Sequence, residues 1–214
     1  IVAHRATFLA GYQNAAYAAR YRALVEAARA AETRAVGAPG AFAQAVARSA
    51  FKLMAYKDEY EVARLHRDPS FRASLAAQFE DGFRLKYHLA PPLLARIDPR
   101  TGKPGKIAFG RWIEPAFALL ARMKGRRGPR LDPFGRTAER RMERRLVEDY
   151  FALVNALAGK LSPETLAAAT ALARLPEEIR GFGHVKLAAV ERYEKRKAEL
   201  AARLGDAVET ERAA

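Results

Sequence analysis

Residues 177–186, with the sequence EEIRGFGHVK, hold the pattern that most resembles a phosphate-binding loop. Two glycines flank Phe182, and His184 and Lys186 follow where a helix is expected to start. A dinucleotide-binding loop would need a third glycine at the position of Lys186 and a buried strand before the first glycine. The preceding residues are rich in alanine and helical in character, which favours a glycine bend between two helices. A helix N-terminus carrying His184 and Lys186 could still meet an anion.

Other residues suited to acid–base or metal chemistry form no catalytic pattern. The four histidines include no pair at i,i+3 or i,i+4 spacing, so no helical two-histidine metal site is predicted, although a site assembled from distant parts of the chain stays open. The segment KDEYE (57–61) holds three carboxylates, but adjacent helical residues point apart, which favours an ion-pair face. The sequence has no cysteine, which excludes disulfides, thiolate catalysis and cysteine-ligated zinc or iron–sulfur clusters. We therefore predict no catalytic or metal-binding residue.

Basic residues are concentrated between Arg122 and Arg145. Ten Lys and Arg against three Asp and Glu give this segment a net charge of +7, half of the +14 of the whole chain. Such an excess favours an anionic partner, whereas a solvated helix with internal salt bridges is the alternative. The residues that we expect to dock an anion are Arg126, Arg127, Arg130, Arg140, Arg141, Arg144, Arg145, His184 and Lys186.

The composition indicates a folded protein outside the membrane. The chain has 214 residues, half of them hydrophobic, which is enough for one good core or two small domains. No run of eighteen apolar residues is present, so no transmembrane helix is expected. The first residues lack the pattern of a signal peptide, and the absence of cysteine agrees with a cytoplasmic location. Because the chain begins with Ile1, we interpret it as part of a longer or processed polypeptide.

Hydrophobic periodicity predicts a mainly α fold, a multi-helix domain with a small β-hairpin or strand insertion near residues 83–110. We expect one domain over residues 1–204 and a mobile tail over 205–214, with Ile179 and Phe182 anchored in the core. The expected helices cover residues 4–34, 41–66, 69–79, 115–124, 136–159, 163–174 and 184–204, with a single turn from Pro176. The expected strands are 83–89 and a hairpin of 93–97 with 106–110.

Four long stretches resemble the C-terminal region of the large single-chain bacterial indolepyruvate ferredoxin oxidoreductases. They are ARSAFKLMAYKDEYEVARLH (47–66), YHLAPPLLARIDPRTGKPGKIAFGRW (87–112), LDPFGRTAERRMERRLVEDY (131–150) and LPEEIRGFGHVKLAAVERYEKRKAELAARL (175–204). The similarity, in the order of these stretches and in their amino-acid sequences, extends from about residue 3 to residue 204.

The resemblance implies a parent enzyme of the 2-oxoacid:ferredoxin oxidoreductase family. Such an enzyme uses thiamine diphosphate to decarboxylate an arylpyruvate oxidatively, passing the acyl group to coenzyme A and electrons to ferredoxin through iron–sulfur chemistry. The Gly-Asp-Gly motif of the diphosphate site is absent here, since LGDAVE (204–209) does not match it. The resemblance therefore implies that this fragment holds no cofactor and is inactive alone, and no catalytic residue of the family can be transferred to this chain.

Three functions stay open from the sequence. The first is an accessory region for packing between modules of the parent enzyme, for dimerisation, or for shielding the active site. The second is a basic helical module that binds nucleic acid or another polyanion, based on charge alone. The third is a contact surface for ferredoxin or coenzyme A. We favour the first, with the third as its refinement, and expect a homo-oligomer without membrane or nucleic-acid partners.

Overall fold

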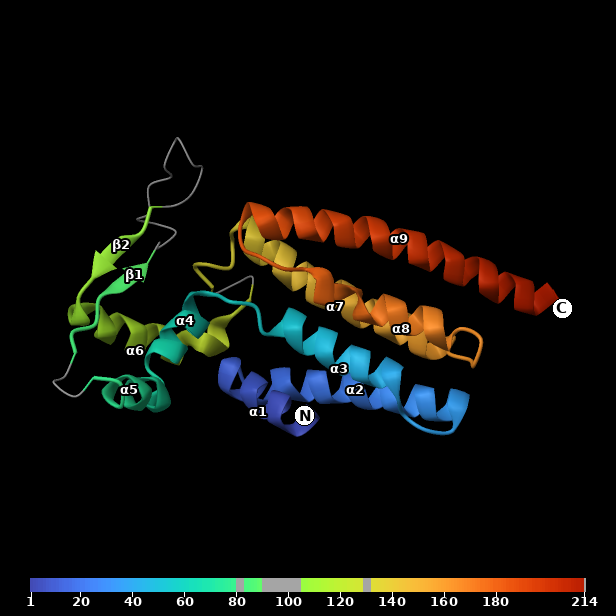
Figure 1. Ribbon diagram of the computed structural model, residues 1–214, viewed down its shortest axis with the longest axis horizontal. Helices are drawn as coiled ribbons and strands as arrows, with labels where there is room; N and C mark the ends of the chain where they lie inside the picture. The colour runs from blue at the N-terminus through green and yellow to red at the C-terminus, as the bar shows by residue number, and fades with distance from the viewer. Residues whose placement is uncertain (80–82, 90–104, 129–131, 214) are drawn as a thin grey trace. The chain divides into compact units, whose positions relative to one another are not determined.

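The protein is mainly α-helical, with one small antiparallel sheet, as predicted (Figure 1). The computed structural model describes residues 1–79, 83–89, 105–128 and 132–213, with side chains up to residue 205. Contacts within the chain define two compact units. The first unit is Ile1–Tyr56 together with Thr137–Ala214, and the second unit is Lys57–Arg136. The single domain over residues 1–204 stays a prediction.

The first unit is a bundle of α-helices. Its elements are α1 (Val2–Tyr12), α2 (Ala15–Val36), α3 (Ala41–Met54), α7 (Ala138–Gly159), α8 (Leu166–Arg174), the 3-10 helix η3 (Leu175–Glu178) and α9 (His184–Ala213). Helix α2 packs against α1, α3 and α7, while α3 also packs against α7 and α8 (Figure 1). Helix α8 in turn contacts α9. The two stretches of chain that flank the second unit therefore build one core together.

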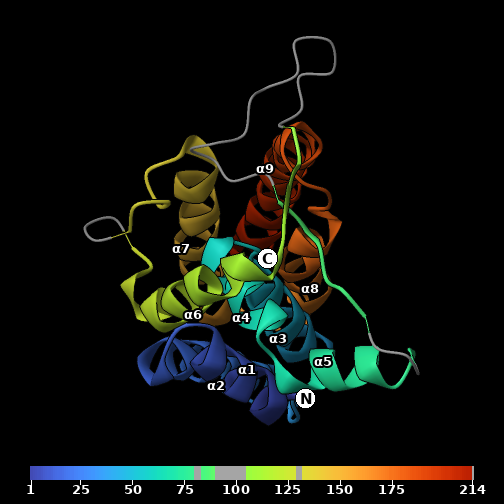
Figure 2. The ribbon, with the colours of Figure 1, turned by 90° about the vertical axis from the view of Figure 1, so that its left-hand side faces the viewer.

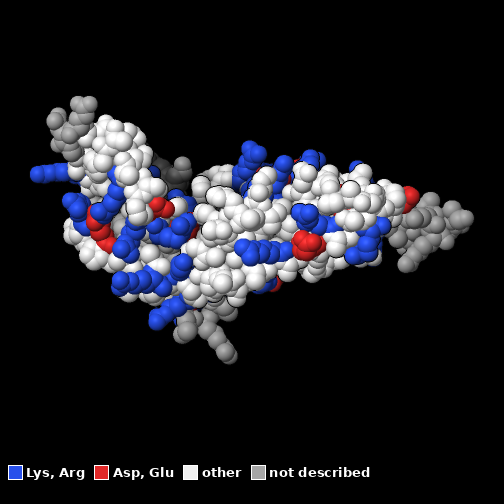
Figure 3. All heavy atoms as spheres, turned by 90° about the horizontal axis from the view of Figure 1, so that it is seen from below, with Lys and Arg blue, Asp and Glu red and all other residues white. Residues whose placement is uncertain are grey.

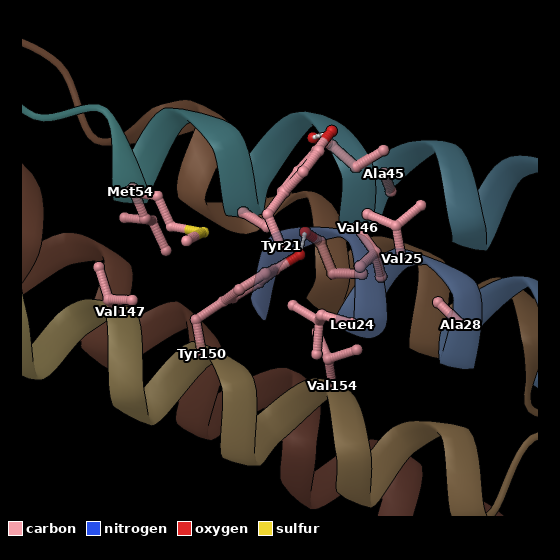
Figure 4. Close-up of a cluster of buried hydrophobic side chains, with 14 of the residues drawn as sticks. Tyr21, Leu24, Val25, Ala28, Ala45, Val46, Met54, Val147, Tyr150 and Val154 are labelled. Carbon is pink, nitrogen blue, oxygen red and sulfur yellow. Dashed lines mark hydrogen bonds between the residues drawn. The ribbon is translucent and has the colours of Figure 1, made fainter. Parts of the chain in front are cut away.

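Large side chains from α2, α3 and α7 fill the core of the first unit. Leu146, Tyr21 and Tyr150 are almost fully buried. The Tyr21 hydroxyl donates to the Ala47 carbonyl at 3.0 Å, and the Tyr150 hydroxyl donates to the Ala173 carbonyl at 2.8 Å. Figure 4 shows both tyrosines within the cluster that fills the space among these helices. Because each buried hydroxyl has a partner, the rings bury apolar area without an unsatisfied polar group.

Two of the predicted long helices are each divided in two. The expected helix 4–34 is broken after Tyr12, and α2 starts from Asn14, whose Oδ1 accepts from the Tyr17 amide at 2.8 Å. The expected helix 41–66 ends at Met54, and α4 (Glu59–His66) starts from Asp58, whose Oδ1 accepts from the Glu61 amide at 2.8 Å. Asn and Asp favour N-caps because their side chains satisfy amides that lack a partner in the first turn.

A buried carboxylate joins α2 to the start of α3. Glu32 is 1% exposed, and its carboxylate accepts hydrogen bonds from the amides of Gly40 at 2.6 Å, Phe42 at 3.0 Å and Ala43 at 3.0 Å. These amides belong to the N-cap and first turn of α3, where no carbonyl of the helix can satisfy them. The negative charge also lies at the positive end of the helix dipole. Glu32 therefore caps a helix that begins nine residues after it.

We expect Glu32→Ala to lower the free energy of unfolding of the first unit by about 2–3 kcal/mol, because it leaves several amides without an acceptor. Glu26→Ala, on the same helix but with a side chain that is 78% exposed, is the matched control and should change stability by less than about 0.5 kcal/mol. Denaturant unfolding followed by circular dichroism measures both. Equal losses for the two variants would show that the Glu32 cap does not stabilise the fold.

The second unit combines short helices with the sheet. Its elements are α4, α5 (Pro69–Ala76), β1 (Tyr87–Leu89), β2 (Ile107–Phe109), the 3-10 helix η1 (Arg111–Ile113), α6 (Glu114–Arg122) and the 3-10 helix η2 (Met123–Arg126). Helix α4 packs against α6 (Figure 2). The buried side chains of its small core come from α4, both strands and α6, and they are Ala63, Tyr87, Phe109 and Phe117.

The sheet pairs the two ends of the region in which strands were predicted. Strand β2 pairs antiparallel with β1, with Tyr87 opposite Phe109. Residues 93–97, the predicted hairpin partner of 106–110, lie outside the described residues. The described strand β1 also covers only the end of the expected strand 83–89. Tyr87 and Phe109 are both buried, so burial of this cross-strand aromatic pair accounts for the observed register.

Three predicted features of the C-terminal third also need correction. Helix α8 begins at Leu166 instead of residue 163, although Ser162 makes the contact expected of an N-cap, its Oγ accepting from the Thr165 amide at 3.3 Å. Helix α9 continues to Ala213 instead of ending near residue 204. Ile179 is buried as expected, but Phe182 is 69% exposed and is no core anchor.

His66 lies among aromatic rings in the second unit. Its ring stacks on Phe117 at 5.3 Å between centroids and meets Tyr87 and Phe71 edge to face at 5.1 and 5.8 Å. Burial, and then the positive charge of Lys57, lower the pKa of His66 below its ordinary value. The folded protein therefore favours the neutral imidazole, whereas the unfolded chain takes up a proton near the ordinary pKa of about 6.5.

We expect the second unit to lose stability as the pH falls through about 6.5, because the unfolded state then binds more protons than the folded state at His66. The loss should level off below the lowered pKa of the folded state. Denaturant unfolding followed by the emission of Trp112, the single tryptophan, measures it at fixed pH values. His66→Leu should flatten this dependence, whereas His88→Gln, at an exposed strand position, should retain it. An unchanged slope in His66→Leu would contradict the assignment.

Candidate anion-docking surface

A buried carboxylate on α7 forms ion pairs with two of the cations that were predicted to dock an anion. Glu143 is 4% exposed, and Arg140 donates to it through Nη1 at 2.5 Å. Lys186, in the first turns of α9, donates to its other oxygen through Nζ. The Arg140 guanidinium also lies 5.8 Å from the centre of the Tyr56 ring. Lys186 thus joins α9 to α7 through Glu143, whereas Arg140 pairs with Glu143 within α7. Both cations are engaged inside the first unit and do not present their charges to an outside partner.

Further positive charge gathers near the start of α9. Lys52 Nζ donates to the Glu177 carbonyl at 2.6 Å. Partial burial, and then the charges of Arg180 and Lys186, lower the pKa of the Lys52 ammonium, while the charge of Glu177 opposes this shift. The sequence did not single out Lys52, because it lies more than a hundred residues before these partners in the chain.

The GFG segment is a bend between two helical elements, which confirms the preferred interpretation. It joins η3 to α9, so the element directly before it is a helical turn and not a strand. Gly181 has a φ of 91°, and a Cβ built there would lie 2.5 Å from Val185 Cγ1. Gly183 has a φ of 56° and its carbonyl accepts from the Leu187 amide. Both the backbone conformation and the close approach require glycine at 181.

The second unit contains a buried ion pair. Arg127 donates from Nε to Asp58 Oδ2 at 2.6 Å and from Nη2 to Asp58 Oδ1 at 2.7 Å, and both side chains are less than 5% exposed. The guanidinium also lies 5.3 Å from the centre of the Tyr60 ring. The prediction that Arg127 docks an outside anion is therefore corrected, because its charge is already neutralised within the unit.

A second buried contact holds the chain that follows Arg127. The Tyr60 hydroxyl donates to Asp132 Oδ1 at 2.9 Å, and the Phe134 amide donates to the same oxygen at 3.0 Å. Burial, and then the hydrogen bond and charge of Asp132, raise the pKa of Tyr60 well above its ordinary value. The phenol stays protonated and acts as a donor, so this pair serves structure and not acid–base chemistry.

The remaining predicted docking residues are spread over both units. Arg126 is exposed in the second unit, and Arg130 lies outside the described residues. In the first unit Arg141 and Arg145 are exposed, Arg145 lies 3.9 Å from Asp149, and Arg144 is half-buried. His184 is exposed at the start of α9. Of the predicted docking residues, the structure joins Arg140 and Lys186 through Glu143 and buries Arg127 in the other unit. Exposed at the surface are Arg126, Arg141, Arg145 and His184.

The surface is nevertheless strongly cationic. On the face drawn in Figure 3, Lys and Arg side chains greatly outnumber Asp and Glu. Among the described residues, no three His, Asp or Glu side chains are placed to hold a metal ion. Over the same part of the chain, no helix is both long enough and apolar enough to cross a membrane. The chemistry that this surface offers is the attraction of anionic groups.

Sequence reasoning missed an exposed aromatic residue beside these surface cations. Trp112, in η1, is 70% exposed, although its ring lies edge to face against Phe109 at 5.5 Å. The sequence did contain a signal for this exposed residue. Trp112, Ala116 and Leu119 are apolar at helical spacing, and Ala116 and Leu119 lie on a different face of α6 from the buried Phe117.

Residues 1–199 match a protein family described as "Family of unknown function (DUF6537)". The chain belongs to this family. A search of curated proteins and a search of solved structures each found no match. The family assignment covers both units, since the match extends from α1 into α9.

Proposed function

We propose that the chain is a non-catalytic helical domain of an indolepyruvate, or arylpyruvate, ferredoxin oxidoreductase. That enzyme decarboxylates 2-oxoacids oxidatively to acyl-coenzyme A with thiamine diphosphate and ferredoxin, in the cytoplasm. The proposal rests on the four stretches that resemble the C-terminal region of these enzymes. The domain packs against other modules of the parent enzyme, which assembles as a homo-oligomer.

The observation that supports a non-catalytic role is that the buried charged side chains form ion pairs with one another within the fold. The four stretches that carry the resemblance contain Asp58, Glu143 and Lys186. Each of these side chains forms an ion pair that joins elements of its own unit. A catalytic carboxylate needs access to a substrate and a proton that it can exchange. Glu143 and Asp58 instead are buried, each against a cation of the same chain.

The cofactors of the proposed parent enzyme do not fit the residues of this chain. A cluster of iron and sulfur is held by cysteine thiolates, and the chain has no cysteine. The Gly-Asp-Gly motif expected at the diphosphate of thiamine is also absent. Thiamine diphosphate and the clusters therefore belong to other modules of the proposed parent enzyme, and no step of the reaction is assigned to this chain.

The test is an assay of the longer polypeptide that contains the chain, with the chain alone as its control. Indolepyruvate, coenzyme A, thiamine diphosphate and an electron acceptor are supplied to both under anaerobic conditions. The longer polypeptide should form acyl-coenzyme A and reduce the acceptor, whereas the chain alone should do neither above a heat-treated sample. Turnover by the chain alone, or none by the longer polypeptide, would overturn the proposal.

The alternative is a basic helical module that binds nucleic acid or another polyanion. The net charge of +14 favours it. Several of the cations that produced this charge nevertheless pair with carboxylates of the same unit, among them Arg127, Arg140 and Lys186. Those cations are not available to displace counterions from phosphates, which is the main source of nonspecific affinity for DNA.

A further inference from the structure

The 3-10 helix η1 and helix α6 expose an apolar stripe. Trp112 is 70% exposed and Leu119 is 61% exposed, and Ile107 on strand β2 is 38% exposed. Trp112 and Leu119 are seven residues apart, with the exposed Ala116 between them. Ala116 and Leu119 are three residues apart on α6 and so are neighbours on one side of that helix, and Trp112 lies in η1, which leads directly into it.

The stripe is additional to the face by which this helix packs into its own unit. Ile113, Phe117 and Leu120 lie at i, i+4 and i+7 and pack in the small core with Tyr87 and Phe109. A surface helix of a globular protein normally carries polar residues opposite such a face. Here a tryptophan and a leucine occupy exposed positions instead, and exposed apolar groups of this kind, bordered by polar residues, mark contact sites.

Exposed cations lie before and after the stripe along the chain. Lys106, Arg122 and Arg126 are exposed, and within the described residues none of them forms an ion pair. Arg111 lies 3.5 Å from Glu114, which also accepts from Arg72 at 2.6 Å. The second unit, residues 57–136, holds seventeen Lys and Arg against nine Asp and Glu, a net charge of +8. Described residues 105–128, which contain the stripe, hold six Lys and Arg against one carboxylate, that of Glu114.

We infer that the exposed residues of η1, α6 and η2, namely Trp112, Ala116 and Leu119 with Arg122 and Arg126, dock an acidic protein that carries an apolar patch. Tryptophan and arginine are the residues most enriched among those that dominate the energy of protein interfaces. The cations would accelerate encounter with an acidic surface, and burial of Trp112 and Leu119 would supply affinity. The inference does not depend on the oxidoreductase proposal.

The charge and chemistry of the face disfavour other occupants. A second copy of this chain would bring the same positive unit against it, and like charges at an interface oppose association. Single-stranded nucleic acid would stack on Trp112, but the aliphatic Leu119 and Ile107 offer no stacking surface for further bases. A lipid surface would need a broader apolar face, and α6 already buries its other apolar face within the unit.

The experiment uses the full chain and a synthetic helical peptide with Asp and Glu on one face and Leu and Phe on the other. Binding is followed by the emission of Trp112, which should shift to shorter wavelength as the ring is buried, and by calorimetry for variants that lack it. Trp112→Ala with Leu119→Ala should weaken peptide binding at least about tenfold. Arg122→Glu with Arg126→Glu should weaken it at low salt and reduce its salt dependence.

Matched controls separate this face from the rest of the surface. Phe79→Ala removes an aromatic side chain that is 50% exposed in the same unit, and Arg145→Glu reverses an exposed charge on α7; neither should change the affinity. Unaltered thermal unfolding shows that the face variants fold.

Three further probes decide the class of partner, namely a peptide of the same charge without apolar residues, duplex DNA and phosphatidylglycerol vesicles. Preference for the amphipathic peptide, lost in the Trp112 and Leu119 variant, supports the inference. Absence of peptide binding, or affinity unaffected by these substitutions, would overturn it. Tighter binding of DNA or vesicles that needs the same residues, or self-association through them, would also overturn it.

Discussion

Arg127→Ala should lower the free energy of unfolding of the second unit by about 3–5 kcal/mol, the usual cost of removing one partner of a buried ion pair. The substitution leaves the Asp58 carboxylate, which is 4% exposed, without its two hydrogen bonds from the guanidinium. Amide exchange across α4 measures the effect, because the same carboxylate also caps this helix. Exchange in α7, which belongs to the first unit, should change much less.

Arg126→Ala is the control for this substitution, since Arg126 is exposed beside Arg127 and should matter by no more than about 0.5 kcal/mol. A double variant, Arg127→Met with Asp58→Asn, should cost less than the sum of the single changes, because the neutral cap no longer leaves an uncompensated buried charge. Additive losses, or an Arg127→Ala variant as stable as Arg126→Ala, would contradict the buried pair.

Leu146→Ala should destabilise the first unit by about 2–5 kcal/mol, the range found when a buried leucine is emptied. Leu146 is 2% exposed and belongs to the core cluster to which α2, α3, α7, α8 and α9 all contribute. Denaturant unfolding measured by circular dichroism tests this. Arg145→Ala changes the adjacent, exposed position and should cost less than about 1 kcal/mol. Similar effects of the two substitutions would place Leu146 outside the core.

Local patterns in the sequence predict most of the helices. They predict only some of the breaks between helices. The spacing of Leu146, Tyr150 and Leu157 predicts α7, and all three side chains are buried in the structure. The breaks before α2 and α4 depend on Asn14 and Asp58, which cap helices between two segments that both favour helix. Because the residues on both sides of each cap favour helix, their helical propensity does not show that one helix ends there and another begins.

The roles of the charged residues depend on contacts that no local pattern contains. Arg127 and Asp58 are 69 residues apart, and Lys186 and Glu143 are 43 residues apart. Counting charges in residues 122–145 could not distinguish Arg127, which is buried, from Arg126, which is exposed. The same holds for Glu32, since the sequence places it in a helix but cannot show that it caps the next one.

The apolar face of α6 was open to prediction but was hidden by the expectation that apolar residues are buried. Trp112 and Leu119 follow the same helical spacing as Ile113, Phe117 and Leu120, one position earlier. Periodicity identifies apolar positions around a helix but does not tell which of two adjacent stripes its own fold covers. Packing of α6 against α4 and the sheet makes that choice.

The central claim is that the buried charged groups of this chain serve its fold and not the chemistry of the proposed parent enzyme. The measurement is the kcat for indolepyruvate of the longer polypeptide carrying Glu143→Gln, taken together with its thermal unfolding. The account predicts a kcat within about twofold of the unaltered enzyme and a lower unfolding temperature, because Arg140 and Lys186 lose their shared carboxylate. A loss of kcat of about a hundredfold or more, the scale of a missing general acid or base, with an unchanged unfolding temperature would contradict it.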